Sequence, residues 1–161
     1  GIRGPQGTGV LCGRADLIEA AYANASPHQF IGRGLKVAKE EIIGLSKALE
    51  IFIDEDEDEE NRRYQNMCDQ VIDALIEIPG INIETKFDSY DYLIPTAVIT
   101  FDPDRKGLSR DQVWEQMIAS KPSIYLSNLG TPDELAVDPF NIADSELEIV
   151  IDRLQELLVQ N

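Results

Sequence analysis

Two stretches of helical periodicity, one on each side of an acidic block, constrain the fold of this chain most. Apolar residues recur at helical spacing over residues 35–52 and again over residues 64–78. Between the two stretches, residues 54–60 are all Asp or Glu. The pattern predicts two consecutive helices, with the acidic block at their junction, because carboxylates favour the positive N-terminal end of the second helix. A Pro-Gly pair at 79–80 is expected to end that helix.

Shorter elements are expected before these helices. Residues 10–13 are apolar and bounded by glycine, which predicts a buried strand. Residues 16–24 show helical spacing and are predicted to form a helix that ends before Ser26-Pro27, since the residue ahead of a proline avoids the helical region. Residues 26–34 contain too much glycine for a regular element and are expected to form a shaped loop.

The last half of the chain changes to alternating and β-rich patterns. Two helices are expected there, after capping patterns at Ser109 and Ser145. Four strands are expected, at residues 81–87, 97–101, 123–126 and 135–137. The order strand, strand, helix, strand, strand, helix predicts an α+β layer, with an antiparallel sheet and the helices on one of its faces.

Length and charge bound the class of protein. The 161 residues fit one domain, or a small domain with an appendage, and 43% of them are hydrophobic, enough for a packed core. A formal charge of −16 argues against nucleic acid and against anionic membranes as partners. No apolar run approaches a membrane span and no signal peptide is recognisable, so a cytoplasmic location is expected. Cys12 and Cys68 are expected to be buried thiols, with a disulfide or metal pair as the alternative.

Two polar features are poor candidates for a catalytic or metal site. The alternating acids from Asp54 to Asp58 resemble the start of a calcium loop, but Glu59 replaces the required glycine and Gln65 the required acid. A solvated acidic surface is therefore favoured, and no metal site is predicted. His28 is the single histidine, and it is expected either to form an ordinary hydrogen bond or to line a pocket.

Two other segments suit the binding of an anion. Gly7, Thr8 and Gly9 belong to a glycine-rich opening in which the backbone can approach a ligand closely. Arg33 and Lys36 are two cations on a glycine-bounded loop before the first long helix, and they suit a carboxylate or a phosphate. The alternative is that Lys36 and Lys39 pair with Glu40 and Glu41 along the helix surface.

Together these segments resemble a family of pyridoxal-phosphate enzymes. The matching residues are 4–14 (GPQGTGVLCGR), 16–20 (DLIEA) and 31–42 (IGRGLKVAKEEI). They are similar to the L-seryl-tRNA selenium transferase-like, or selenocysteine synthase-like, proteins of the fold type I aminotransferase superfamily, whose relatives include D-glucosaminate-6-phosphate ammonia-lyase. The similarity is specific over the first third of the chain and only architectural from Ile81 onward.

The resemblance implies that the chain is the C-terminal portion of a larger, homo-oligomeric enzyme. Residues 1–40 would be the end of the α/β large domain, residues 41–80 the connecting helices, and residues 81–161 the small α+β domain. The lysine that holds the cofactor is expected just before Gly1, so this chain would not bind pyridoxal phosphate covalently.

The same resemblance implies roles for individual residues. Arg33 and Lys36 would bind the anionic group of the substrate. Gly7, Thr8, Gly9 and His28 would lie near the cofactor or a subunit interface. The expected activity is that of a lyase or transferase on a small anionic amino acid or amino-sugar acid. The alternative is an α+β module without catalytic activity that binds or assembles with a partner.

Overall fold

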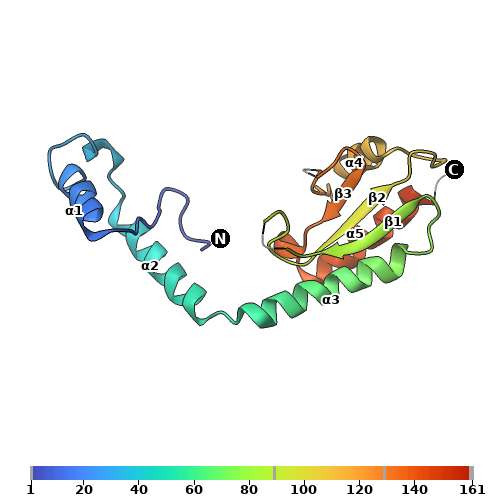
Figure 1. Ribbon diagram of the computed structural model, residues 1–161, viewed down its shortest axis with the longest axis horizontal. Coiled ribbons are helices and arrows are strands. Elements are labelled where there is room, and N and C mark those ends of the chain that lie inside the picture. The colour runs from blue at the N-terminus through green and yellow to red at the C-terminus, as the bar shows by residue number, and fades with distance from the viewer. Residues whose placement is uncertain (1, 89, 129, 160–161) are drawn as a thin grey trace. The chain divides into compact units, whose positions relative to one another are not determined.

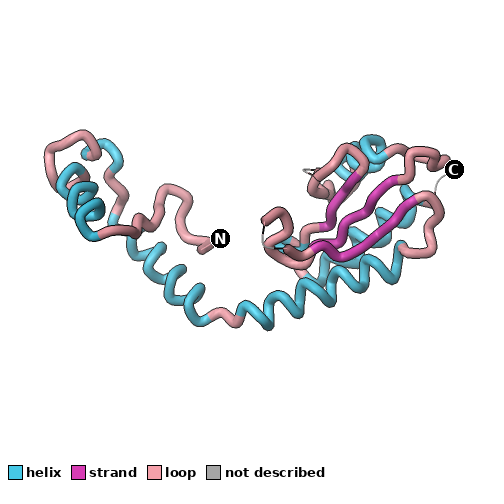
Figure 2. The backbone as a smooth tube through the Cα atoms, in the orientation of Figure 1, coloured by secondary structure: helices cyan, strands magenta, loops and turns pink. Residues whose placement is uncertain are grey.

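The computed structural model describes residues 2–88, 90–128 and 130–159. The chain divides into two compact units, Gly1–Asp56 and Glu57–Asn161, which are described separately below. Figure 2 shows that strands occur only in the second unit among the described residues. The boundary between the units falls within the range 41–80 that was predicted to hold the connecting helices, at the expected acidic junction.

The first unit is helical. It contains α1 (Ala15–Asn24), the short 3-10 helix η1 (Arg33–Leu35) and α2 (Lys39–Asp54). Helix α1 confirms the helix predicted for residues 16–24. The longer helix is also confirmed, but it begins at Lys39 because the residues before it form η1. None of the described residues of this unit is buried.

The strand predicted for residues 10–13 is wrong. These residues form no strand pairing among the described parts of the chain, and Val10 and Leu11 are exposed. A strand requires hydrogen bonds from a neighbouring strand, and an apolar run between glycines does not supply that neighbour.

The second unit is an α+β layer, as predicted. Its elements are α3 (Glu57–Leu75), β1 (Ile81–Lys86), β2 (Thr96–Phe101), α4 (Arg110–Ala119), β3 (Glu134–Val137), the 3-10 helix η2 (Pro139–Asn141) and α5 (Asp144–Leu158). The three strands form an antiparallel sheet in the order β1-β2-β3. Figure 1 shows this order directly.

The core lies on one face of this sheet. Ile83, Ile99 and Leu135 stand opposite one another across the three strands and belong to the buried cluster. Helix α3 packs against β1 and β2, α4 packs against β3, and α5 packs against both of these helices. The alternation of side chains along β2 therefore directs Ala97, Ile99 and Phe101 toward the helices, and the prediction of helices on one face is confirmed.

Two predicted details of the second unit are wrong. Residues 123–126 form no strand, because Ile124 donates its backbone N–H to Met117 at the end of α4 (3.0 Å), and only Ser127 makes a bridge to Ala136. Ser145 is not the N-cap of α5. The helix begins two residues earlier than that cap predicts, and the Glu146 carboxylate accepts the backbone N–H of Ala143 (2.9 Å).

The two cysteines differ in their surroundings. Cys68 lies in the core of the second unit, as predicted, and burial raises the pKa of its thiol to about 11. Cys12 is exposed, so the expectation of a buried thiol is wrong there. Among the described residues, no helix has both the length and the apolar composition needed to cross a membrane.

Candidate functional site

The glycine-rich opening folds into a turn that lies on α2. The backbone N–H and the hydroxyl of Thr8 both donate to the carbonyl oxygen of Pro5, at 3.0 and 2.5 Å. A Cβ atom on Gly44 would lie 2.8 Å from Pro5 Cγ, and one on Gly7 would lie 2.7 Å from Glu41 Oε1. The missing side chains of these two glycines therefore allow the turn to approach the helix closely.

This contact places the turn beside the N-terminal end of α2. The Glu41 carboxylate, which touches Gly7, also accepts the backbone N–H of Ala38 at 3.1 Å. Lys36 lies two positions before Ala38 and is exposed. A Cβ atom on Gly9 would meet nothing within 4 Å, so the backbone there stays open to a ligand.

The lysines near α2 do not form the ion pairs that the alternative predicted. Among the described residues, neither Lys36 nor Lys39 pairs with Glu40 or Glu41, although Lys47 pairs with Glu50 further along the helix at 3.0 Å. Lys36 and Lys39 therefore keep charges that could attract an anion, although the first turn of α2 also holds the carboxylates of Glu40 and Glu41.

Arg33 supports the loop that connects α1 with α2. Its Nη1 atom donates to the carbonyl oxygen of Pro27 (2.7 Å) and to the hydroxyl of Ser26 (3.4 Å). Gly32 closes the same loop by donating its N–H to Asn24 O at 2.8 Å. Since only Nη1 has a partner among the described residues, the other guanidinium nitrogens of Arg33 can donate to a ligand.

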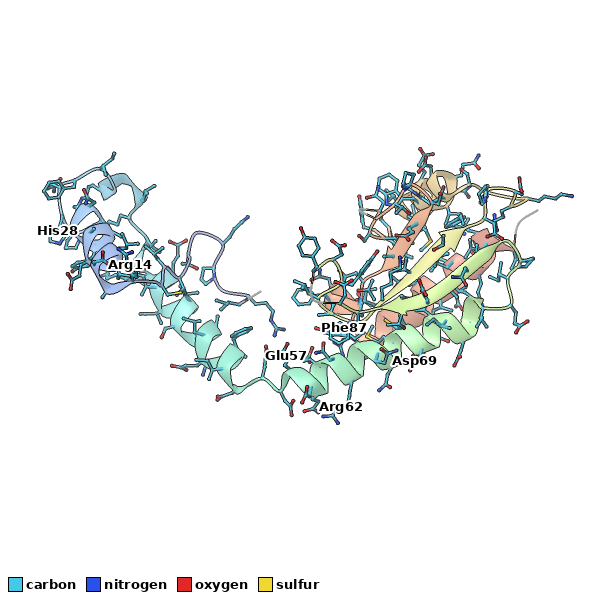
Figure 3. All side chains as sticks on the ribbon, viewed as in Figure 1. Arg14, His28, Glu57, Arg62, Asp69 and Phe87 are labelled. Carbon is cyan, nitrogen blue, oxygen red and sulfur yellow. The ribbon has the colours of Figure 1, made fainter. Side chains whose placement is uncertain are left out.

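His28 lies at the other end of this loop, beside α1 (Figure 3). Its backbone N–H donates to Ala25 O at 2.9 Å, and its ring meets the Tyr22 ring edge to face, with 5.3 Å between centroids. Within the described parts of the chain the imidazole has an aromatic neighbour and no hydrogen-bond partner. The loop thus holds both His28 and Arg33, without a direct contact between them.

A polar cluster in the second unit escaped the sequence analysis. Lys86 Nζ lies 2.7 Å from Glu134 Oε1 and 5.5 Å from the centre of the Tyr92 ring. The ion pair raises the pKa of Lys86 and lowers that of Glu134, while burial raises the pKa of Tyr92. The cluster joins the end of β1 and Tyr92 of the loop after β1 to the start of β3, which is distant in sequence, so no local spacing predicts it.

The first unit offers several donors that suit an anion. They are Lys36 and Lys39 just before and at the start of α2, the remaining guanidinium nitrogens of Arg33, and the open backbone at Gly9. Donors of these kinds suit the phosphate of pyridoxal phosphate or an anionic group of a substrate, but the structure shows no contact that joins Arg33, the lysines and Gly9 into one site among the described residues. Within the described residues, no three His, Cys, Asp or Glu side chains are grouped so that they could hold a metal ion.

Comparisons with known proteins find two related enzymes. The chain is 32% identical over 155 residues to the 5'-C-glycyluridine monooxygenase-decarboxylase of Streptomyces sp, which covers 96% of this chain and 38% of that protein. It is 25% identical over 151 residues to the D-glucosaminate-6-phosphate ammonia lyase of Salmonella typhimurium, which covers 93% of this chain and 39% of that protein. No protein-family model matches.

The fold is also similar to part of a solved enzyme structure. The structure of D-glucosaminate-6-phosphate ammonia-lyase matches with a TM-score of 0.66 and 25% identity, over 91% of this chain and 38% of that chain. The chain therefore spans about two fifths of the length of these relatives. It is related to lyase-like enzymes, while the closer assignment to selenium transferases stays a prediction.

Proposed function

We propose that this chain is part of a pyridoxal-phosphate-dependent lyase or transferase that acts on an amino acid or amino-sugar acid with an anionic group. One observation supports this proposal most. The glycine-rich turn contacts the N-terminal end of α2 through Gly7 and Glu41, and Lys36 and Lys39, which form no ion pair among the described residues, lie next to this end in the sequence. The similarity to an ammonia lyase whose named substrate is a phosphorylated amino-sugar acid supports the same class of substrate.

Each residue then has a defined task. Lys36 attracts the anionic group of the substrate, and Arg33 donates from the guanidinium nitrogens that its loop contacts leave free. Gly7 and Gly9 keep the backbone accessible, and Thr8 holds the turn closed through Pro5. Pyridoxal phosphate, when bound, supplies a ring that withdraws electrons from the substrate's α-carbon.

The proposal extends to the whole protein. By the resemblance described above, the lysine that binds the cofactor covalently lies outside the 161 residues. Residues 1–40 then belong to the large domain, residues 41–80 to the connecting helices and residues 81–161 to the small domain. We also propose a homo-oligomer, because many apolar side chains of the first unit are exposed and require a cover.

A cofactor-binding experiment on the intact gene product tests the proposal. Addition of pyridoxal phosphate should give a visible absorbance band, and borohydride should trap it on a lysine other than Lys36 or Lys39. With a substrate in hand, Lys36→Gln should raise KM at least about tenfold, because a charge-assisted contact is lost. Lys47→Gln, an exposed lysine of α2 that pairs with Glu50, is the control and should leave KM unchanged.

Two results would contradict this function. A protein that shows no absorbance band and no trapped lysine does not use the cofactor. A KM that stays the same in Lys36→Gln removes this lysine from the substrate site, even if the cofactor binds.

The second candidate is an assembly module without catalytic activity. It is favoured by the first unit, which lacks buried residues among those described and exposes a large apolar surface. The same absorbance experiment separates the candidates, because a module of this kind gives no band although it still forms a complex.

A further inference from the structure

A groove in the second unit lies between the first turns of α3 and the loop after β1. Its volume is about 540 Å³, within the range of clefts that take ligand-sized groups, and its lining consists of Asp58, Asn61, Arg62, Gln65, Phe87 and Pro95. Figure 3 shows Phe87 over the stretch of α3 between Glu57 and Asp69. The Phe87 side chain is 58% exposed, so an apolar floor is open to a partner.

Hydrogen bonds join the described residues of the loop that leaves this groove. One carboxylate oxygen of Asp88 accepts the backbone N–H groups of Tyr90 and Asp91, both at 2.7 Å, and of Tyr92 at 3.3 Å. The Asp88 N–H in turn donates to the carbonyl oxygen of Tyr92 at 2.8 Å. Tyr92 then lies over Lys86, in the polar cluster described above.

The described residues of this loop present further apolar side chains to solvent. Tyr90 is 88% exposed, and Leu93 is exposed as well. Exposed aromatic side chains such as Phe87 and Tyr90 are typical of interfaces, where aromatic anchors carry most of the affinity.

The charge next to the groove indicates the chemistry of its partner. Asp58 lines the groove and belongs to the first turn of α3, which is the acidic rim and contains Glu57, Asp58, Glu59 and Glu60. Arg62 is the single cation of the lining, and its Nε atom already donates to the carbonyl oxygen of Asp58 at 3.0 Å. An apolar floor with an acidic rim favours a segment that combines aliphatic side chains with positive charges.

The chain itself contains such a segment. Residues 1–39 carry five Lys or Arg and two Asp or Glu, a net charge of +3. The remaining residues carry nine Lys or Arg and 28 Asp or Glu. Within this cationic part, Ile31 is 93% exposed and Leu35 is 83% exposed, and Lys39 follows them without an ion pair among the described residues. Large exposed aliphatic side chains that lie close together in the chain are typical of a surface that a partner covers.

We propose that the groove at Phe87 and Pro95 receives residues 30–39 of a second copy of this chain, with Ile31 and Leu35 on its floor and Lys39 at its acidic rim. The inference rests on the homo-oligomer of the proposed function and names its contact surface. In a two-fold dimer each copy contributes one segment and one groove, so the contact forms twice. Lys36 lies within the same segment but takes no part in this contact, so it stays available to the substrate.

A disulfide between differently tagged copies of the full-length protein tests this contact. One copy carries Leu35→Cys and the other Phe87→Cys, both in a Cys12→Ser background, because Cys12 is exposed and would react. Co-expression and mild oxidation should give a disulfide-linked species that contains both tags. The matched control replaces Phe87→Cys by Tyr125→Cys, another exposed aromatic position of the second unit, and should give none.

The contrary results are distinct. The proposal is overturned if the tagged copies do not cross-link, or if the control pair cross-links equally well. A protein that carries both Leu35→Cys and Phe87→Cys in one chain, and forms the disulfide only within that chain, shows that the segment of the same copy is the occupant. In that case, too, the proposal fails.

A measurement of association gives a second test that does not depend on cysteine chemistry. By sedimentation, Phe87→Asp should weaken self-association at least about tenfold, and Tyr125→Asp should not. Raising the salt concentration should also weaken self-association of the unmodified protein, because salt screens the attraction between Lys39 and the acidic rim. If Phe87→Asp remains as strongly associated as the unmodified protein while pyridoxal phosphate still binds, this surface is wrong and the proposed function stands.

Discussion

Replacing Gly80 with alanine should destabilise the second unit by about 3 kcal/mol. Gly80 has a φ of +78°, in the left-handed region that costs a residue with a Cβ atom roughly 1–2 kcal/mol. The new Cβ atom would also lie 2.6 Å from Arg105 Cγ. Arg105 cannot move aside freely, since its guanidinium donates to the carbonyl oxygens of Leu108 and Leu158, and weakening one such bond costs about 1.5 kcal/mol.

The single tryptophan makes this loss simple to measure. Trp114 lies in α4 and donates its indole N–H to Leu126 O at 3.1 Å, so its fluorescence reports unfolding of the second unit alone. With an m-value of about 2 kcal/mol/M in urea, a loss of 3 kcal/mol lowers the midpoint by about 1.5 M.

Two further variants separate the backbone cost from the collision. Gly80→Asn should lose about 1 kcal/mol less than Gly80→Ala, because asparagine tolerates the left-handed region better. In an Arg105→Ala background, Gly80→Ala should cost only the backbone part, about 1–2 kcal/mol. If Gly80→Ala costs the same in both backgrounds, the collision with Arg105 is not the cause, and a cost below about 0.5 kcal/mol refutes the backbone argument as well.

The remaining predictions concern the half-buried ion pair between Lys86 and Glu134 and the two cysteines. Lys86→Met should lower the free energy of unfolding by about 1–3 kcal/mol, because it leaves Glu134 without its counter-charge, and adding Glu134→Gln should restore part of the loss. Because Lys86 lowers the pKa of Glu134, this pair stabilises the fold above the ordinary carboxyl pKa, and the stabilisation is lost as the pH falls below that value. In urea titrations from pH 6 to 3, the free energy of unfolding should therefore fall less in Lys86→Met than in the unmodified protein. Cys68, whose pKa burial raises to about 11, should be alkylated only after unfolding, whereas Cys12 should react in the native protein; mass spectrometry of both thiols checks this. The buried thiol of Cys68 also contributes to the free energy of unfolding. This contribution is fully present below pH 9 and should decline between pH 9 and 11, because the thiol ionises at lower pH in the unfolded chain than in the folded one.

Elements with local signals were predictable from the sequence. Helix α4 begins as expected, because the Ser109 hydroxyl accepts the N–H of Gln112 (3.3 Å) and the Gln112 side chain accepts the N–H of Ser109 (2.9 Å). All the atoms of this cap lie within four residues. The cap expected at Ser145 is equally local, yet Glu146 forms the competing contact with Ala143 and starts the helix earlier. Two overlapping patterns of similar quality are not separated by spacing alone.

Features that depend on register or on distant partners were not predictable. Lys86 and Glu134 are 48 residues apart, and they meet only because β1 and β3 both pair with β2. The strand expected at residues 123–126 failed for the same reason, since Ile124 bonds to the end of α4 and not to a strand. For the proposed anion site, spacing selected Arg33 and Lys36, but the contact of Gly7 with Glu41 required the folded turn.

The periodicity of α2 contained more information than the prediction of a helix used. A helix with one buried face has a single apolar stripe, and in α2 that stripe consists of Ile42, Leu45, Leu49 and Phe52. Ile43, Ile51 and Ile53 are additional and exposed. The Gly4–Thr8 turn covers only part of the helix surface, near Leu45 and Ala48. A helix that is apolar on several sides is typical of the interior of a larger body, so these off-stripe isoleucines indicate a cover from outside their own unit.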